Sequence, residues 1–334
     1  MLALGVTLRD VYEAREAMAG IAVRTPLIDS PELTERVGAF VYLKLENVQR
    51  TGSFKIRGAA NKLRSLTEGE LERGVITVSS GNHGQAVTYV AQELGVRAVV
   101  CMSRRVPRNK VACIRRLGAE VVLHGESYDE AERHALRLQD QYGLTLIPPF
   151  DDPHIIAGQG TIGLELLEDL PGVDTVVVPL SGGGLLSGIA LALKSADPSI
   201  RTVGVSMDRA PVMFHSLRVG HPIEMEEEET IADALVGGIG LENKYTFRII
   251  QEYVDETLLV TEDEIAHAMA FALDRHHQVV EGGGAVALAA LLQGKVRRLG
   301  EKVGIVLSGG NVEIPLLMEI AKHRIGTDSI SEGV

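Results

Sequence analysis

The chain lacks tryptophan and is poor in other aromatic residues, with 6 phenylalanines and 7 tyrosines among 334 residues. Positive charge is also scarce, since 33 Lys and Arg against 45 Asp and Glu give a formal net charge of −12. Nucleic-acid binding depends on positive charge to neutralise phosphates and often on aromatic rings to stack with bases. We therefore expect no nucleic-acid partner.

Cysteines and long apolar runs are scarce too. Cys101 and Cys113 are too few for a disulfide framework, and their spacing is not that of a metal site. The longest apolar run, residues 285–292, is far too short to cross a membrane. Charges such as Arg9 and Glu13 within residues 1–20 exclude the apolar core of a signal peptide. These absences predict a cytoplasmic protein with no membrane partner.

What remains is the composition of a well-packed globular protein, with 45% hydrophobic and 23% charged residues. Short β-branched runs alternate with longer amphipathic segments, which predicts an α/β fold whose parallel sheet is covered by helices on both faces. The expected strands are 75–79, 98–102, 121–124, 175–180, 202–206 and 303–307. The expected helices are 85–94, 110–117, 128–142, 185–194 and 262–276.

A chain of this length favours two lobes. Residues 68–153 contain their own alternation of strands and helices, and we expect them to form a small inserted domain. Residues 1–67 and 154–334 would then form the large domain. Prolines at 148, 149 and 153 disfavour continued helix and mark the return between the two. Open α/β sheets bind ligands at the carboxyl ends of their strands, so motifs that follow strands are the candidates for chemistry.

The glycines of residues 181–184 (SGGG) stand between an expected strand and an expected helix. Free backbone N–H groups and the positive end of the helix dipole would hold a phosphate there. A tight turn that needs glycine for positive φ explains the same residues equally well. The loop has neither the glycine spacing of a dinucleotide-binding loop nor the Gly-Lys-Ser/Thr of a P-loop.

Lys55 lies between the apolar residues Phe54 and Ile56. An amine that is desolvated there has a lowered pKa and attacks carbonyl carbons, although a lysine taken at random is more commonly an exposed surface residue. The glycine loop, the amide of Asn82 and the hydroxyl of Ser308 add to this amine what a phosphorylated pyridine aldehyde needs. Together they predict a site for pyridoxal 5'-phosphate (PLP).

Four motifs, residues 53–59, 80–86, 157–161 and 308–311, resemble those of the fold-type II PLP enzymes. The resemblance is to the threonine/serine dehydratase and serine racemase family and covers residues 8–321. It implies a two-lobed, tryptophan synthase β-like fold in which each lobe is a mostly parallel sheet flanked by helices. It also implies PLP as cofactor and a homodimer. The glycine-rich residues 231–243 resemble the dehydratases of hydroxyectoine utilisation more specifically.

The resemblance also implies roles for individual residues. Lys55 would hold the cofactor and remove the Cα proton, while Ser308 would meet the ring nitrogen. The implied cofactor-binding residues are Phe54, Lys55, Asn82, Gly182, Gly183, Gly184, Leu185, Gly238, Glu281 and Ser308. The implied substrate-carboxylate loop consists of Ser79, Ser80, Gly81, Asn82 and His83, although a histidine such as His83 is by itself more often a packed residue than a base.

Two positions depart from the pattern of ordinary threonine dehydratases. Ser80 stands where many of them have alanine, as in serine racemases and hydroxyaspartate dehydratases, and would supply an acid on the face opposite Lys55. Relatives that bind a divalent cation have glutamate and aspartate at the positions of Ser206 and Val212. We therefore expect no metal at that site.

The expected activity is PLP-dependent α,β-elimination of water from a small β-hydroxy amino acid such as L-threonine or L-serine, giving a 2-oxo acid and ammonia. One alternative is dehydration of 3-hydroxyaspartate or of a hydroxyectoine-derived compound. Another is racemisation of serine or aspartate, for which Ser80 is the motive. An alternative of a different class is a non-catalytic PLP-binding protein, against which the combination of Lys55 and the glycine loop argues.

Overall fold

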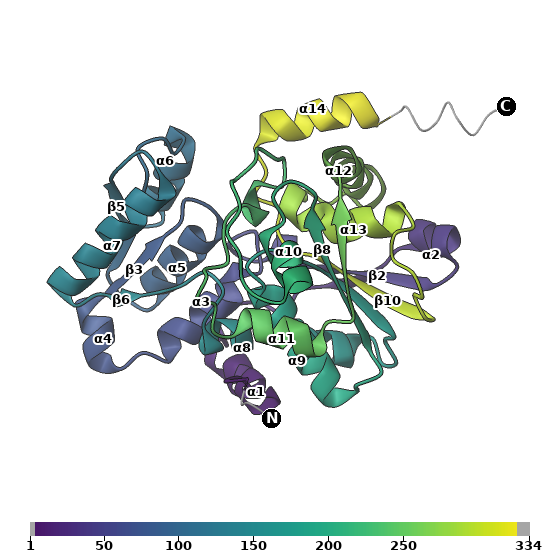
Figure 1. Cartoon of the computed structure of the whole chain (residues 1–334), viewed down its shortest axis with the longest axis horizontal. Helices are drawn as coiled ribbons and strands as arrows, with labels where there is room; N and C mark the ends of the chain where they lie inside the picture. Colours follow the sequence, from purple (N-terminus) through teal and green to yellow (C-terminus); the bar gives the residue numbers. More distant parts are fainter. Residues whose placement is uncertain (1–3, 326–334) are drawn as a thin grey trace.

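The computed structural model describes residues 4–325, which form two sheets with helices on their faces (Figure 1). The larger sheet has the strand order β1-β2-β10-β7-β8-β9, and only the β1–β2 pair is antiparallel. Its strands are β1 (Leu27–Asp29), β2 (Phe40–Leu45), β7 (Thr175–Pro179), β8 (Arg201–Met207), β9 (Glu256–Val260) and β10 (Lys302–Leu307).

The smaller sheet, drawn at the left in Figure 1, has the strand order β5-β4-β3-β6 and is entirely parallel. Alternate residues of its central strands belong to different hydrophobic clusters, one with α5 and the other with α7. Because successive side chains of a strand point to opposite faces, both faces are covered. The strands are β3 (Val75–Val78), β4 (Ala98–Met102), β5 (Glu120–Leu123) and β6 (Thr145–Leu146), and the helices are α5 (Asn82–Glu93), α6 (Arg108–Arg116) and α7 (Tyr128–Tyr142).

The remaining helices accompany the larger sheet. Helix α13 (Gly282–Leu292) is apolar on all sides and wholly buried, as expected for a helix enclosed between a sheet and other helices. The other helices are α1 (Leu8–Ala17), α2 (Pro31–Val37), α3 (Lys55–Arg64), α4 (Glu68–Arg73), α8 (Pro153–Asp169), α9 (Gly184–Ala196), α10 (Val212–Val219), α11 (Thr246–Tyr253), α12 (Glu262–His276) and α14 (Ile314–Arg324), with 3-10 turns η1 (Glu46–Val48) and η2 (Asp233–Leu235).

Close packing of α3 on α8 fixes the helix that begins at Lys55. A Cβ atom on Gly58 would lie 2.4 Å from the Gln159 side chain, and one on Gly158 would lie 2.7 Å from the carbonyl oxygen of Arg57. Helix α9 packs on α8 in the same way, since a Cβ atom on Gly188 would lie 2.3 Å from the carbonyl oxygen of Ile156. Glycine at these positions lets the backbones approach where no larger residue would fit.

The predicted fold class, an α/β protein with mostly parallel sheets flanked by helices, is confirmed. All six expected strands and five expected helices are present with shifts of a few residues at their ends. Strands β1, β2, β6 and β9 were not expected from the sequence. Within residues 4–325, no helix combines the length and apolarity that a membrane crossing requires.

Candidate active site

The lysine motif and the Ser308 motif lie side by side. Phe54 donates its backbone N–H to the carbonyl oxygen of Ser308 at 3.0 Å, and Gly310 donates to Gly52 at 2.8 Å. A bridge between Ser53 and Gly309 completes the pairing. Two segments that are more than 250 residues apart in sequence therefore lie hydrogen-bonded to each other. Lys55 begins α3 in one of them, and Ser308 directly follows β10 in the other.

The amine of Lys55 contacts a backbone carbonyl and an aromatic ring. Its Nζ donates to the carbonyl oxygen of Pro149 at 2.8 Å and lies 5.2 Å from the centre of the Phe54 ring. Burial lowers the pKa of Lys55 to about 8, although the nearby carboxylate of Glu281 acts in the opposite direction. About a tenth of the amine is therefore neutral and nucleophilic at pH 7, far more than for an exposed lysine.

The glycine loop begins helix α9 and is closely enclosed. Gly183 adopts φ 90°, and a Cβ atom on it would lie 2.7 Å from the Ile250 side chain. A Cβ atom on Gly182 would lie 2.3 Å from the ring of Phe150, which follows Pro149 directly. The first N–H groups of a helix have no acceptor within it, so this loop presents them to an anion.

Pro149 and Phe150 connect the two halves of the site. Pro149 accepts a hydrogen bond from Lys55, and the Phe150 side chain packs on Gly182 and Gly184. The chain returns here from the small sheet, and Asp152 then caps α8 by accepting from the N–H groups of His154 and Ile155. The return segment therefore sets the position of the amine relative to the glycine loop.

Asn82, at the start of α5, joins a hydrogen-bonded chain between the two lobes. Its Nδ2 donates to Glu281 Oε1 at 2.6 Å, and its Oδ1 accepts from Asn311 Nδ2 at 2.7 Å. Asn311 Nδ2 also donates to the carbonyl oxygen of Thr51 at 2.8 Å. Burial raises the pKa of Glu281 to about 7, although the hydrogen bond from Asn82 acts in the opposite direction. These hydrogen bonds hold the Asn82 side-chain amide in one orientation.

The loop after β3 contains the remaining predicted substrate residues. Ser79, Ser80 and Gly81 are partly exposed, and the N–H of Gly81 contacts Ser79 Oγ at 3.3 Å. His83 differs, because its ring is buried and its Nε2 lies 3.0 Å from the carbonyl oxygen of Ile147. Burial, together with the charge of Lys55, lowers the pKa of His83 to about 3, so the imidazole is neutral at neutral pH.

The other predicted contacts lie around this centre. Leu185 is buried in the first turn of α9, and Ser308 is buried at the end of β10. Gly238 lies in the segment after η2, where a Cβ atom would meet open space. Ser181 donates its hydroxyl to the carbonyl oxygen of Leu235 at 2.8 Å, which ties that segment to the glycine loop.

Ser206 and Val212, which stand where metal-binding relatives have carboxylates, are both buried. Ser206 lies in β8, where its Oγ contacts the sulfur of Met207 at 3.6 Å, and Val212 begins α10. Neither residue supplies the negative charge that Mg²⁺ or Ca²⁺ usually receives from carboxylates.

A buried charge network beneath Lys55 was not foreseen from the sequence. Arg57 is fully buried and makes bidentate contacts to Glu46, with both N–O distances 2.8 Å, and to Glu165, at 2.6 and 2.9 Å. Lys44 is also fully buried and pairs with Glu165 at 2.6 Å. The network joins β2, η1, α3 and α8, and it anchors the helix turn that carries Lys55.

The residues of this site fit PLP. The amine of Lys55, whose pKa is lowered, contacts Pro149 of the return segment. On the other side of that segment lies the glycine loop, where Phe150 leaves no room for a side chain at position 182. A family model described as "Pyridoxal-phosphate dependent enzyme" matches residues 19–309. The chain belongs to this family.

Similar proteins within the pyridoxal-phosphate dependent enzyme family cover nearly the whole chain. L-threonine ammonia-lyase of Thermotoga maritima is 46% identical over 94% of this chain and 78% of its own length. The catabolic L-threonine dehydratase of Escherichia coli K12 is 42% identical over 95% of this chain and 96% of its own. The structure of maize serine racemase superposes with a TM-score of 0.90 at 35% identity, covering 96% and 98%. The predicted family and cofactor are confirmed.

Proposed function

We propose that this PLP-dependent enzyme is an ammonia-lyase that removes water from L-threonine or L-serine and releases a 2-oxo acid and ammonia. The observation that carries the proposal is the lysine of lowered pKa beside a glycine-lined helix N-terminus. The relatives named as threonine ammonia-lyase and threonine dehydratase support the choice of substrate.

We assign to Lys55 both the attachment of the cofactor and the removal of the Cα proton. Bound PLP supplies an electron sink for the negative charge left at Cα. The partly neutral amine of Lys55 accepts the proton, and the β-hydroxyl then leaves with a proton as water. Hydrolysis of the released enamine consumes one water molecule and yields the 2-oxo acid and ammonia, so the water released in the elimination is balanced.

We assign the other residues to binding. The N–H groups of Gly182, Gly183, Gly184 and Leu185 would hold the cofactor phosphate, and the Ser308 hydroxyl would meet the ring nitrogen. The remaining residues that would bind the cofactor are Phe54, Asn82, Gly238 and Glu281. The α-carboxylate of the substrate is bound by the loop of Ser79, Ser80, Gly81, Asn82 and His83, in which the buried His83 ring stabilises the loop from beneath.

The two lobes close over the substrate through contacts beside the site. Lys110 of α6 pairs with Asp233 of η2 at 2.9 Å, and Asn109 donates to Glu313 at 3.1 Å. We place the boundary between the lobes at residues 68 and 153. Closure of the small lobe excludes water, which otherwise hydrolyses the reactive intermediate or reprotonates Cα at the wrong time.

Racemisation is the second candidate, and the position of Ser80 favours it. Ser80 follows β3 in the substrate loop and is partly exposed, so its hydroxyl is available as an acid. The resemblance in structure to maize serine racemase supports this candidate. Dehydration of 3-hydroxyaspartate or of a hydroxyectoine-derived compound is the substrate alternative, and a homodimer in the cytoplasm without a divalent cation is the setting that we propose.

Release of 2-oxo acid from a panel of β-hydroxy amino acids tests the proposed function, with chiral analysis of the remaining substrate. We expect turnover of L-threonine and L-serine, and loss of turnover by orders of magnitude in Lys55→Ala. The exposed lysine Lys322 of α14 provides a matched control, because Lys322→Ala leaves the site untouched. No 2-oxo acid from any β-hydroxy amino acid, with the cofactor bound, contradicts an ammonia-lyase. Racemised substrate in the chiral analysis would then identify a racemase, and unchanged substrate would leave the non-catalytic binding protein.

A further inference from the structure

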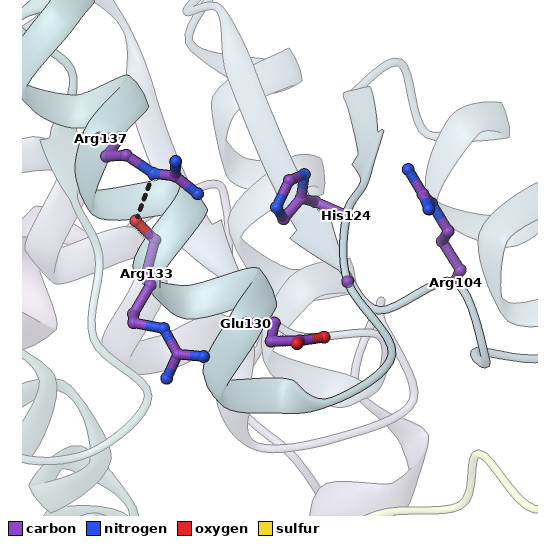
Figure 2. Close-up of a pocket in the computed structure, with 6 residues that line it drawn as sticks. Arg104, His124, Glu130, Arg133 and Arg137 are labelled. Atoms are coloured by element: carbon purple, nitrogen blue, oxygen red, sulfur yellow. Dashed lines mark hydrogen bonds between the residues drawn. The ribbon is translucent and has the colours of Figure 1, made fainter.

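The small lobe contains a cavity of about 310 Å³ that plays no part in the site described above. It is lined by Arg104, His124, Gly125, Glu130, Arg133 and Arg137. In Figure 2, His124 and Glu130 lie between Arg104 on one side and Arg133 and Arg137 on the other. The volume is at the lower end of the range of about 300–1,000 Å³ that small-molecule sites occupy.

The charge of this cavity is unbalanced. Three exposed arginines and one carboxylate line it, and within residues 4–325 none of the three has a carboxylate oxygen within 4.0 Å. Glu130 Oε2 accepts the backbone N–H of Glu126 at 2.5 Å, and this hydrogen bond, with a smaller contribution from the charge of Arg133, lowers the pKa of Glu130, so one negative charge stands against three positive ones. This concentration of unpaired positive charge stands out in a chain whose formal net charge is −12.

The topology explains how residues from separate segments converge here. Arg104 follows β4, and His124 and Gly125 follow the neighbouring strand β5, so both loops leave the carboxyl edge of the same parallel sheet. Two backbone hydrogen bonds hold the loops together, from Arg104 to Gly125 and from His124 to Met102, both at 2.9 Å. Arg133 and Arg137 come from α7. The carboxyl edge of a parallel sheet is where α/β folds bind ligands.

One wall of the cavity is a fixed flat surface. The ring of His124 stacks on that of His134, with centroids 4.0 Å apart and an interplanar angle of 13°. Arginine side chains offer planar forks of N–H donors that match the oxygens of a phosphate in bidentate contacts. Three guanidinium groups around one cavity provide more hydrogen-bond donors than the two oxygens of a carboxylate ligand can accept, which favours a phosphate as the ligand.

We propose that this cavity binds a phosphate group, either free phosphate or the phosphate of a small ester, at a site separate from the cofactor. Arg104, Arg133 and Arg137 supply the charge, and His124 forms the flat wall beside it. Binding relieves the repulsion among the three arginines, so the ligand stabilises the small lobe.

The test measures ligand binding to the holoenzyme, in which the cofactor already fills the glycine loop. Inorganic phosphate, glycerol 3-phosphate and acetate are titrated by calorimetry at constant ionic strength, and the thermal midpoint is recorded with each. We expect both phosphate compounds to bind and to raise the midpoint. Acetate should do neither. Tighter binding of glycerol 3-phosphate than of free phosphate would identify an ester as the ligand, and the reverse order would identify free phosphate.

Variants locate the site. Arg133→Ala with Arg137→Ala should weaken phosphate binding by about tenfold or more for each arginine removed. Arg115→Ala with Arg116→Ala is the matched control, since these exposed residues of α6 remove the same charge from the same lobe. Arg104→Ala, from a different loop, should weaken binding even if the α7 variant folds poorly. Equal affinity of control and α7 variant, or no binding of either phosphate compound to the parent, would overturn the proposal.

Discussion

Replacement of Arg57 by methionine should destabilise the protein far more than an ordinary arginine substitution. Arg57 is fully buried and is the cation that faces both oxygens of Glu46, while Glu165 also has Lys44 at 2.6 Å. Among residues 4–325, the substitution therefore leaves Glu46 buried with the Thr25 hydroxyl, at 2.5 Å, as its one remaining side-chain partner. Breaking a buried ion pair by removing one partner costs about 3–5 kcal/mol.

The expected loss translates into a measurable thermal shift. One kcal/mol lowers the midpoint by about 2–4 °C in domains of 150–250 residues, so Arg57→Met should lower it by about 6–20 °C. Arg64→Met provides the control, because Arg64 is exposed on the same helix and its loss should cost no more than about 0.5 kcal/mol. Adding Glu46→Gln to Arg57→Met removes the uncompensated charge and should recover a large part of the loss.

The difference in stability between the parent and Arg57→Met should depend on pH through Glu165. Burial raises the pKa of this carboxyl, but Arg57 and Lys44 outweigh burial and hold the pKa below its ordinary value. In the parent this pairing stabilises the fold above the unfolded pKa, and the contribution is lost as the pH falls through the folded pKa. In Arg57→Met, Glu165 has lost one of the two cations that lower its pKa and accepts a proton more readily. The stability gap should therefore narrow at acidic pH, as measured by thermal unfolding at mildly alkaline and mildly acidic pH. A loss below about 1 kcal/mol, or a gap that widens toward acid, would refute the reasoning.

Three further predictions concern the site. Ser80→Ala should slow racemisation by about 10²–10⁴-fold while largely preserving elimination of the L-substrate, as measured by chiral chromatography and 2-oxo acid release; equal loss of both would limit Ser80 to substrate binding. Gly183→Ala places a side chain at φ 90° and 2.7 Å from Ile250, so PLP should bind about tenfold more weakly in an absorbance titration. Gly220→Ala, at φ 86° in open space, should bind PLP as the parent does. Dialysis against EDTA should leave turnover and the thermal midpoint nearly unchanged, whereas a severalfold loss restored by Mg²⁺ would show a cation site built from residues other than Ser206 and Val212.

The parts of the fold that could be predicted are those whose pattern is local. Strands such as β7 are continuous apolar runs followed by glycine-rich turns, and the sequence shows both features. Strand β2 could not be predicted because Lys44 interrupts its apolar run, and the partners that make this lysine a buried residue, such as Glu165 and the carbonyl of Thr25, come from outside the strand. Strand β6 has two residues, too few for any periodicity.

The site was predictable to the extent that its chemistry lies in motifs. Lys55 and the glycine loop stand next to recognisable strands or apolar flanks, but the link between them through Pro149 and Phe150 depends on how the chain returns from the small lobe. Burial of Arg57 was not foreseeable, because arginine is usually exposed and its two carboxylate partners come from distant segments. The arginine cavity has the same origin, since strand order alone brings β4 beside β5.

The most direct test of the account is to locate the covalent attachment of the cofactor. The holoenzyme is reduced with borohydride and digested, and its peptides are mapped by mass spectrometry. The account predicts that the cofactor's mass is found on Lys55, whose Nζ faces Pro149 beside the glycine loop. Attachment to any other lysine, with Lys55 unmodified, would contradict it.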